Sequence, residues 1–281
     1  ARLVERLEPV FRNPNVNIDA KIGEILPLIE EAVQNDDRPR METLLRLTRL
    51  LEEVHPNEAK AFAVTADLLF HSGRTAEAVE HYRQTLELDD SVYLVWEQLL
   101  NALAQLRRWK ELTRSAEEAL ELFPNQATLN YLYGLGLLEQ GKAPAAVSTL
   151  EQALLMAAGL EDLRFRILGL LGRALCEAGR LEEALRRFEE ARSLNAQSPL
   201  LLATYARCLL SRNQLAKAKT LLEEASRLAP EHPAVLETRG DALFLQGDVD
   251  AALQWWQKAL EKDPENESLK RKISSRSLEG S

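Results

Sequence analysis

Residues 233–266 read PAVLETRGDALFLQGDVDAALQWWQKALEKDPEN, and this stretch decides the fold. Small residues such as Gly240 and large apolar residues such as Trp256 recur at spacings of three and four, which places them on one face of a helix. Gly247 stands where a chain that leaves one helix needs a positive φ before it turns into the next. Pro264 follows the second apolar run and ends it. The stretch therefore predicts two antiparallel helices that approach each other closely at their small residues.

The same pattern recurs upstream with a period of 34 residues. The fourth unit starts four residues late, after the extra segment 161–164. The turn glycine is replaced by Arg107 in the second unit and by Asn213 in the fifth. A fixed period of this length is typical of helical repeat arrays, so we predict consecutive helix-turn-helix units. The predicted units span residues 59–92, 93–126, 127–160, 165–198, 199–232 and 233–266.

The chain on both sides of these units is expected to be helical but less regular. Residues 1–58 are predicted to form a helical lead-in with one degenerate unit, because Leu44 and Leu51 stand at the twentieth and twenty-seventh positions of the continued register. Residues 267–281 are predicted to form a capping helix and a tail, because apolar residues there alternate with basic ones. A cap with a polar outer side keeps the end of a repeat array soluble.

The units resemble the tetratricopeptide repeat (TPR), a 34-residue helix-turn-helix. The unit at 233–266 carries the residues that the family pattern asks for, namely Leu236, Gly240, Leu243, Gly247, Ala252, Trp256, Ala259 and Pro264. The resemblance covers residues 59–266 and implies an all-α fold, an α-solenoid in which antiparallel helix pairs form a right-handed superhelix. It also implies a non-enzymatic scaffold for protein–protein interaction, which holds a peptide segment or helix of a partner in a concave groove.

Composition and charge exclude several classes of function. The 35 basic and 44 acidic residues give a net charge of −9, which argues against nucleic-acid partners, because these need a cationic surface. No apolar run approaches the roughly 18 residues of a membrane span. Cys176 and Cys208 are far apart and outside any CxxC motif, so neither a disulfide nor a zinc site is predicted. We expect a soluble bacterial protein of the cytoplasm or the periplasm.

No catalytic residue, metal site or cofactor is predicted. Residues 136–143 read GLLEQGKA and approach a phosphate-binding loop, but Ala143 stands where Ser or Thr should bind Mg²⁺. The four histidines occupy unrelated positions of the repeats, without the spacing of a metal site. The protein is therefore predicted not to be an enzyme.

In the family, the first helices of successive repeats line the groove with their second, fifth, ninth, twelfth and thirteenth positions. Applied to this chain, that rule gives the candidate partner-binding residues Asp67, Phe70, Glu97, Asn101, Tyr131, Leu138, Arg166, Arg173, Arg207, Leu210 and Asp241. A clamp for the acidic tail of a chaperone is not expected, because Ala63 and Asp67 stand where that clamp has Lys and Asn.

The expected groove has a basic centre of three arginines, Arg166, Arg173 and Arg207. Acidic residues flank this centre at Asp67, Glu97, Glu237 and Asp241. Arg173 and Arg207 hold equivalent positions one unit apart, so together they could grip a carboxylate of an extended peptide. The alternative is that Arg173 pairs with Glu177 along its own helix and that Arg207 is solvated.

Two other functions remain open at this point. The chain could be the regulatory or docking region of a larger multidomain enzyme or sensor, an interpretation favoured by the missing initiator Met and by a first helix that looks truncated. It could also associate with itself as a homodimer through Trp255, Trp256 and the cap, because an open end of the stack exposes apolar surface.

Overall fold

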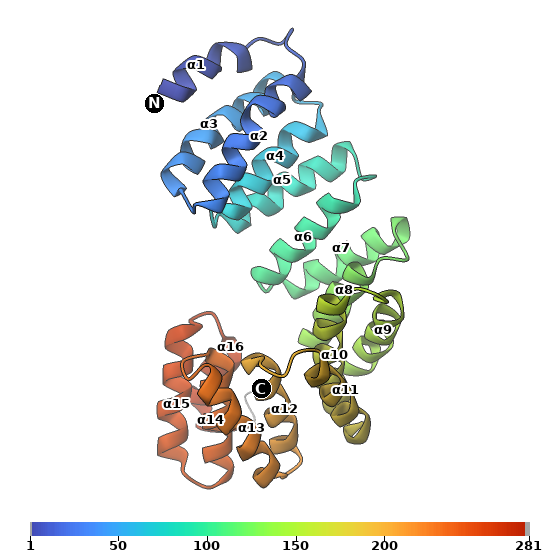
Figure 1. Cartoon of the computed structure of the whole chain (residues 1–281), viewed down its shortest axis with the longest axis vertical. Coiled ribbons are helices and arrows are strands. Elements are labelled where there is room, and N and C mark those ends of the chain that lie inside the picture. The colour runs from blue at the N-terminus through green and yellow to red at the C-terminus, as the bar shows by residue number, and fades with distance from the viewer. Residues whose placement is uncertain (1, 279–281) are drawn as a thin grey trace. The chain divides into compact units, whose positions relative to one another are not determined.

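The computed structural model describes the backbone of residues 2–278 and the side chains from residue 6 onward. This part of the chain folds into helices joined by short turns and contains no strand (Figure 1). The helices group into two compact units, Ala1–Gln140 and Gly141–Ser281. The prediction of an all-α fold built from consecutive helix pairs is confirmed.

The first unit begins with the helices of the lead-in and continues with the repeat helices. Its helices are α1 (Arg2–Phe11), α2 (Ile18–Gln34), α3 (Arg38–Val54), α4 (Ala59–His71), α5 (Thr75–Leu88), α6 (Tyr93–Gln105), α7 (Trp109–Leu122) and α8 (Ala127–Glu139). Each repeat helix packs on the next one along the chain, and each first helix of a pair also contacts the first helix of the following pair. One continuous apolar core runs through these helices.

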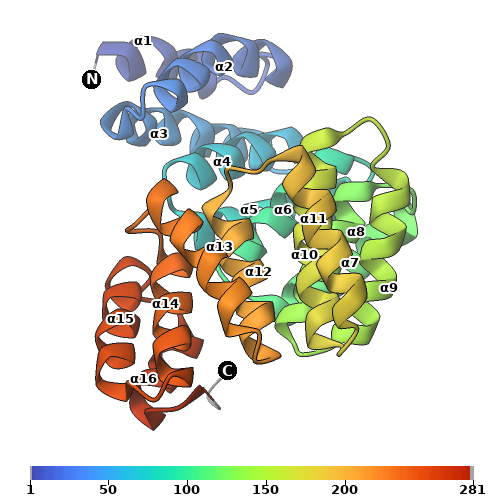
Figure 2. The ribbon, with the colours of Figure 1, turned by 60° about the horizontal axis from the view of Figure 1, so that its bottom comes forward.

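The second unit has the same construction. Its helices are α9 (Ala143–Met156), α10 (Glu161–Glu177), α11 (Leu181–Leu194), α12 (Pro199–Ser211), α13 (Leu215–Leu228), α14 (Pro233–Leu245), α15 (Val249–Lys262) and α16 (Glu267–Ser275). Helices α14, α15 and α16 lie side by side at the end of the chain, as two views show (Figures 1 and 2). The cap α16 begins 34 residues after α14, where the first helix of another repeat would begin.

The 34-residue period marks where first helices begin. Helices α4, α6, α8, α12 and α14 each start on the first residue of an expected unit. Helix α10 starts at Glu161 and not at Phe165, because the four extra residues continue the helix as an additional N-terminal turn. The turn residue after each first helix is left-handed whether or not it is glycine, since Arg107 has φ 53° and Asn213 has φ 57°.

The small residues of the repeat pattern are the points at which paired helices touch. A Cβ atom at Gly240 would lie 2.4 Å from Cδ1 of Trp256, and a Cβ atom at Gly172 would lie 2.8 Å from Cε1 of Phe188. In both pairs, glycine stands at the eighth position of a repeat and the aromatic residue at the twenty-fourth. The absence of a side chain on the first helix therefore makes room for the buried ring of the second helix.

A recurring ion pair closes the turn inside several repeats, and we call it the turn clasp. An arginine caps the second helix and forms two parallel hydrogen bonds to a glutamate in the first turn of that helix. The pairs are Arg74–Glu77, Arg108–Glu111 and Arg180–Glu183. Hydrogen bonds from Arg108, together with Arg83, lower the pKa of Glu111 to about 2.

The lead-in is held by a buried lysine. The ammonium group of Lys21 on α2 donates to the carbonyl oxygen of Phe11 at 2.9 Å and lies 2.8 Å from Nε2 of His55. Burial lowers the pKa of Lys21, and burial together with the charge of Lys21 lowers the pKa of His55. This side chain joins the end of α1, the body of α2 and the end of α3.

The positions of the two cysteines indicate no disulfide framework, but the structure pairs them. Cys176 on α10 and Cys208 on α12 form a disulfide, with their Cα atoms 5.9 Å apart. The two residues are 32 positions apart in sequence, close to one repeat period. Because first helices of successive repeats lie next to each other, a separation of about one period brings two side chains together.

Candidate functional site

The first helices of the first unit present one accessible polar and aromatic surface, which we call the first-unit face. Helix α4 contacts α6, and α6 contacts α8, so equivalent positions of the three helices share this face. The expected residues that lie exposed or half-buried on it are Asp67, Phe70, Glu97, Asn101 and Tyr131. Leu138 belongs to the same set but is buried.

Hydrogen bonds hold the two acidic side chains of the first-unit face. The hydroxyl of Tyr82 donates to Oδ1 of Asp67 at 2.7 Å, and burial of this carboxylate raises the pKa of Asp67. Burial and a hydrogen bond to Glu97 raise the pKa of Tyr93 to about 12. On the same helix as Glu97, the amide of Asn101 makes no side-chain hydrogen bond to any residue that the structure describes. This amide can offer both a donor and an acceptor to a ligand.

The three arginines of the expected basic centre lie on α10 and α12 in the second unit. Arg166 is exposed. Arg173 donates to Oε1 of Glu177 at 2.9 Å, as the alternative interpretation expects. Arg207 reaches the next first helix, α14, where it lies 3.1 Å from Oε2 of Glu237. The structure therefore engages Arg207 with carboxylates of the chain itself and does not leave it simply solvated.

Arg207 belongs to a group of four charged residues that we call the C-terminal charge cluster. The ammonium group of Lys272 on α16 donates to Glu237 at 2.8 Å and to Asp241 at 2.9 Å. Trp256 adds an indole hydrogen bond to Asp241 at 2.9 Å. Burial would raise the pKa of Glu237, but the charges of Arg207 and Lys272 outweigh this effect and lower it.

Asp241 was a candidate partner-binding residue, but the cluster makes it a residue of the interior. Its side chain is buried, and its carboxylate is occupied by Lys272 and Trp256. Glu237 is buried in the same way, and Leu210 also lies beneath the surface. These residues stabilise the end of the array from within. The first helices α10, α12 and α14 of the second unit contact one another in succession, and we call the surface at their corresponding positions the second-unit face. Its accessible part consists of Arg166, Arg173 and the outer side of Arg207.

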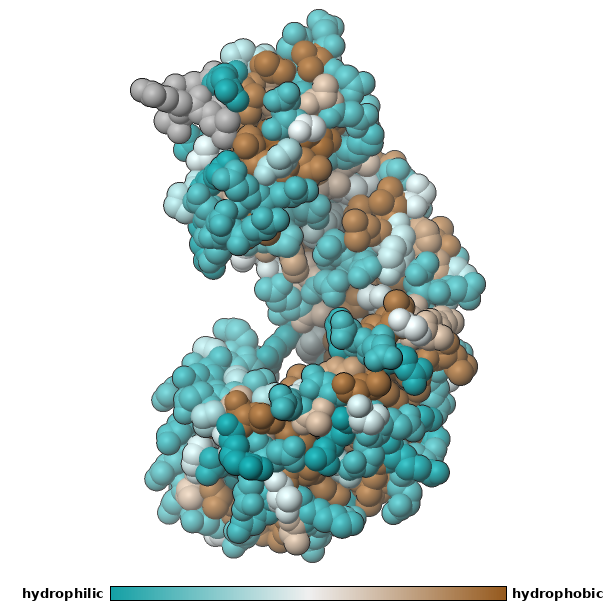
Figure 3. All heavy atoms as spheres, viewed as in Figure 1, coloured by the Kyte–Doolittle hydropathy of each residue, from teal (hydrophilic) through white to brown (hydrophobic). Residues whose placement is uncertain are grey.

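Two exposed leucines were missing from the candidate residues. Leu94 on α6 is 58% exposed and Leu200 on α12 is 55% exposed. Both stand at the second position of a repeat, which the family rule assigns to the groove, so the signal was present in the sequence. Elsewhere on the visible surface of each unit, apolar residues form scattered groups among hydrophilic ones (Figure 3).

The tryptophans expected at a dimer contact have other neighbours. Trp256 is completely buried. The ring of Trp255 is covered by the guanidinium of Arg239, 4.0 Å from its centroid, and by the ammonium of Lys258 at 4.7 Å. Cations at these distances are attracted to an indole ring. Trp256 therefore offers no surface to a second copy, and Trp255 is already in contact with two cations.

The described residues offer neither a metal site nor a membrane span. Among the described side chains of residues 6–278, no three of His, Cys, Asp or Glu come together in an arrangement that could hold a metal ion. Within the same range, every helix is too short or too polar to span a bilayer.

Four family models described as tetratricopeptide repeat match this chain. They cover residues 41–92, 125–197, 175–240 and 233–266. The first match extends the repeat pattern into α3 of the lead-in. No curated protein matches the sequence.

Solved structures share the fold. A tetratricopeptide repeat protein from Parabacteroides merdae superposes with a TM-score of 0.75 at 15% identity, over 89% of this chain and 97% of that chain. The pilus biogenesis factor PilW superposes with a TM-score of 0.60 at 16% identity, over 75% of this chain and 96% of that chain. YrrB, a TPR protein with an unusual peptide-binding site, superposes with a TM-score of 0.52 at 21% identity, over 68% of this chain and 97% of that chain. Likeness at these identities shows the fold.

Proposed function

Because this chain belongs to the tetratricopeptide repeat family and is a scaffold for protein–protein interaction, we propose that it binds a segment of its partner on the first-unit face. The observation that carries this proposal is the amide of Asn101, which shares the first-unit face with accessible aromatic and acidic residues and has no hydrogen-bond partner among the described residues. YrrB, with its peptide-binding site on the same fold, supports it by analogy.

The chemistry of the first-unit face selects a kind of segment. An asparagine amide can hydrogen-bond both the N–H and the C=O of a peptide backbone. Phe70 and Tyr131 provide apolar contact area with few torsions to freeze. Asp67 and Glu97 add negative charge. The preferred segment therefore carries a basic residue near an apolar one.

The second-unit face is proposed to meet an acidic stretch of a partner. Arg166 and Arg173 present guanidinium groups there, and Arg207 contributes its outer side, since its side chain is 42% exposed. Leu200 supplies an exposed apolar contact on α12. Guanidinium groups bind carboxylates with two parallel hydrogen bonds, so they favour Asp and Glu.

Substitution of Asn101 tests the first-unit face. Peptides selected on the wild-type protein from a phage-displayed library of random dodecapeptides are titrated against Asn101→Ala by fluorescence polarisation. Loss of two backbone hydrogen bonds is expected to weaken binding of the peptides held at this face about tenfold. Asn125→Ala in an exposed turn of the same unit is the matched control and should bind as the wild type does. If no peptide is recovered, or if all bind both variants equally, the proposal fails.

We also propose that the protein functions in an oxidising compartment such as the bacterial periplasm. The supporting observation is the Cys176–Cys208 disulfide, because such bonds persist in oxidising compartments and are rare in the cytosol. Protein isolated from its own cells in the presence of iodoacetamide should carry no label on these cysteines before reduction. Quantitative labelling of both before reduction would instead indicate a reducing compartment.

A further inference from the structure

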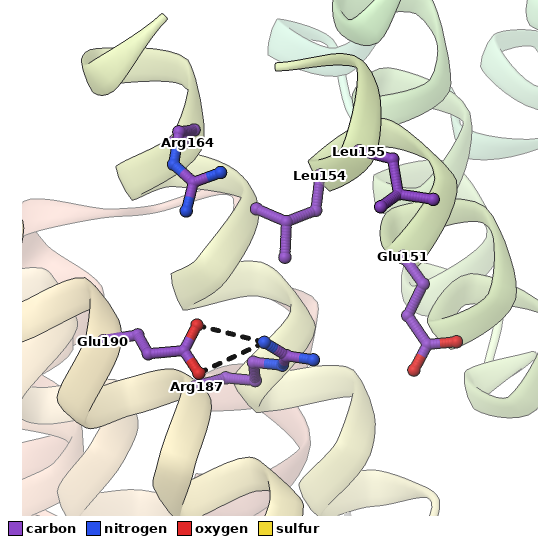
Figure 4. Close-up of a pocket in the computed structure, with 6 residues that line it drawn as sticks. All are labelled: Glu151, Leu154, Leu155, Arg164, Arg187 and Glu190. Carbon is purple, nitrogen blue, oxygen red and sulfur yellow. Dashed lines mark hydrogen bonds and ion pairs between the residues drawn. The ribbon is translucent and has the colours of Figure 1, made fainter. Parts of the chain in front are cut away.

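A cavity of about 440 Å³ lies in the second unit, apart from the faces of the first helices. It is formed mainly by the second helices α9 and α11, together with the first turn of α10 (Figure 4). Its lining residues are Glu151, Leu154, Leu155, Arg164, Arg187 and Glu190. A volume of this size lies within the range of ligand sites in proteins, about 300–1,000 Å³.

The cavity exists where the repeat pattern is broken. Helix α10 has 17 residues, whereas α8 and α12 have 13 each. Arg164 is the last residue of the four-residue extension, which the repeats of standard length do not have. In Figure 4, Arg164 extends from α10 toward the space in front of Leu154.

A second irregularity occurs on the opposite wall. Leu155 is 81% exposed, the largest exposure among the large hydrophobic residues that the structure describes. It stands at the twenty-ninth position of its repeat, and the other five repeats have polar residues there, namely Glu87, Glu121, Ser193, Arg227 and Glu261. An exposed leucine at this position offers apolar area that a bound molecule would bury.

The charges of the cavity are matched except for one. Arg187 pairs with Glu190 at 3.0 Å, and Glu151 lies 3.8 Å from Arg180 outside the cavity. The side chain of Arg164 forms neither a hydrogen bond nor an ion pair within the described part of the chain. The cavity thus combines an unmatched guanidinium with an apolar wall.

We propose that this cavity binds a segment of another protein in which a carboxylate stands next to an aliphatic side chain. The carboxylate accepts two parallel hydrogen bonds from Arg164, and the aliphatic group packs on Leu154 and Leu155. A polypeptide is favoured over a small acid because Leu155 lies on the open rim, where a chain that crosses the cavity covers it. The ligand chemistry is opposite to that of the first-unit face, so the two surfaces hold different segments.

Two variants test the cavity, and both change side chains at or near the surface. Dodecapeptides selected on the wild-type protein are titrated against Arg164→Glu and Leu155→Ser. We expect a class of peptides with Asp or Glu beside Leu, Ile or Val, and an increase in Kd of about tenfold or more for each variant. Arg186→Glu makes the same charge change on α11 outside the cavity and should leave these Kd values unchanged. Circular dichroism of each variant checks that the helices are intact.

The outcomes separate this site from the first-unit face. Peptides that are lost with Asn101→Ala but kept by Arg164→Glu belong to that face. The cavity proposal is overturned if no selected peptide is sensitive to Arg164→Glu and Leu155→Ser, or if the sensitive peptides lack the acidic residue. It is also overturned if the wild type dimerises in analytical ultracentrifugation and Leu155→Ser abolishes the dimer, because a second copy would then cover the cavity.

Discussion

Replacement of Lys272 by methionine is expected to lower the free energy of unfolding by about 3–5 kcal/mol, although the residue belongs to the short terminal helix α16. The side chain is 3% exposed and its ammonium group contacts Glu237 and Asp241. Without it, two buried carboxylates keep only Arg207 as a counter-charge, at 3.1 Å from Glu237 and 3.7 Å from Asp241. Urea titration followed by circular dichroism and tryptophan fluorescence measures the loss.

The matched control is Lys270→Met on the same helix. Lys270 pairs with Glu267 on the surface, and such a pair contributes about 0.5 kcal/mol or less. A loss of similar size in both variants would contradict a special role of the cluster. The triple variant Lys272→Met, Glu237→Gln, Asp241→Asn should recover much of the loss, because it also removes the buried charges that lack compensation.

The stabilisation by Lys272 depends on pH through Glu237. The pKa of Glu237 is lower in the folded protein than in the unfolded chain, so its contribution is present above the ordinary glutamate pKa of about 4.3 and is lost as the pH falls. The difference between the wild type and Lys272→Met should therefore shrink below about pH 4.

Reduction of the Cys176–Cys208 disulfide is expected to lower the free energy of unfolding by about 3–4 kcal/mol. The bond joins residues 32 positions apart, and it restricts the unfolded chain by closing that loop. Protein that is unfolded and refolded in dithiothreitol is compared with untouched protein by urea titration. The double variant Cys176→Ala, Cys208→Ala should resemble the reduced protein and be indifferent to dithiothreitol. Equal stability of the oxidised and reduced wild type would show that the bond adds nothing.

The sequence predicted the helices well because the period, the turn residues and the small residues all report local geometry. Arg107 is an example. Its position in the 34-residue register predicted a turn between two helices, and its backbone has a left-handed conformation there. The same register placed Asn101 and Tyr131 on an accessible face.

Two sets of contacts that the sequence did not predict run between repeats. Cys176 and Cys208 meet only because α10 and α12 are neighbours in the array. Glu237 and Asp241 were expected to be accessible from their positions along α14, and they are covered because α16 brings Lys272 over them. The sequence of a single helix predicts which way each of its side chains points. It does not predict which residues of a later helix will cover that side chain.

The turn clasp differs from these contacts because both of its residues belong to the same repeat. This difference matters when repeats are duplicated or deleted during evolution. Arg74–Glu77, Arg108–Glu111 and Arg180–Glu183 each lie within one repeat, so a duplicated or deleted repeat takes its clasp with it. The disulfide and the C-terminal charge cluster join different repeats, so they survive only if the order of those repeats is kept. The clasp can therefore move with its repeat, whereas the disulfide, the charge cluster and ion pairs such as Arg83–Glu111 depend on which repeat lies next to which.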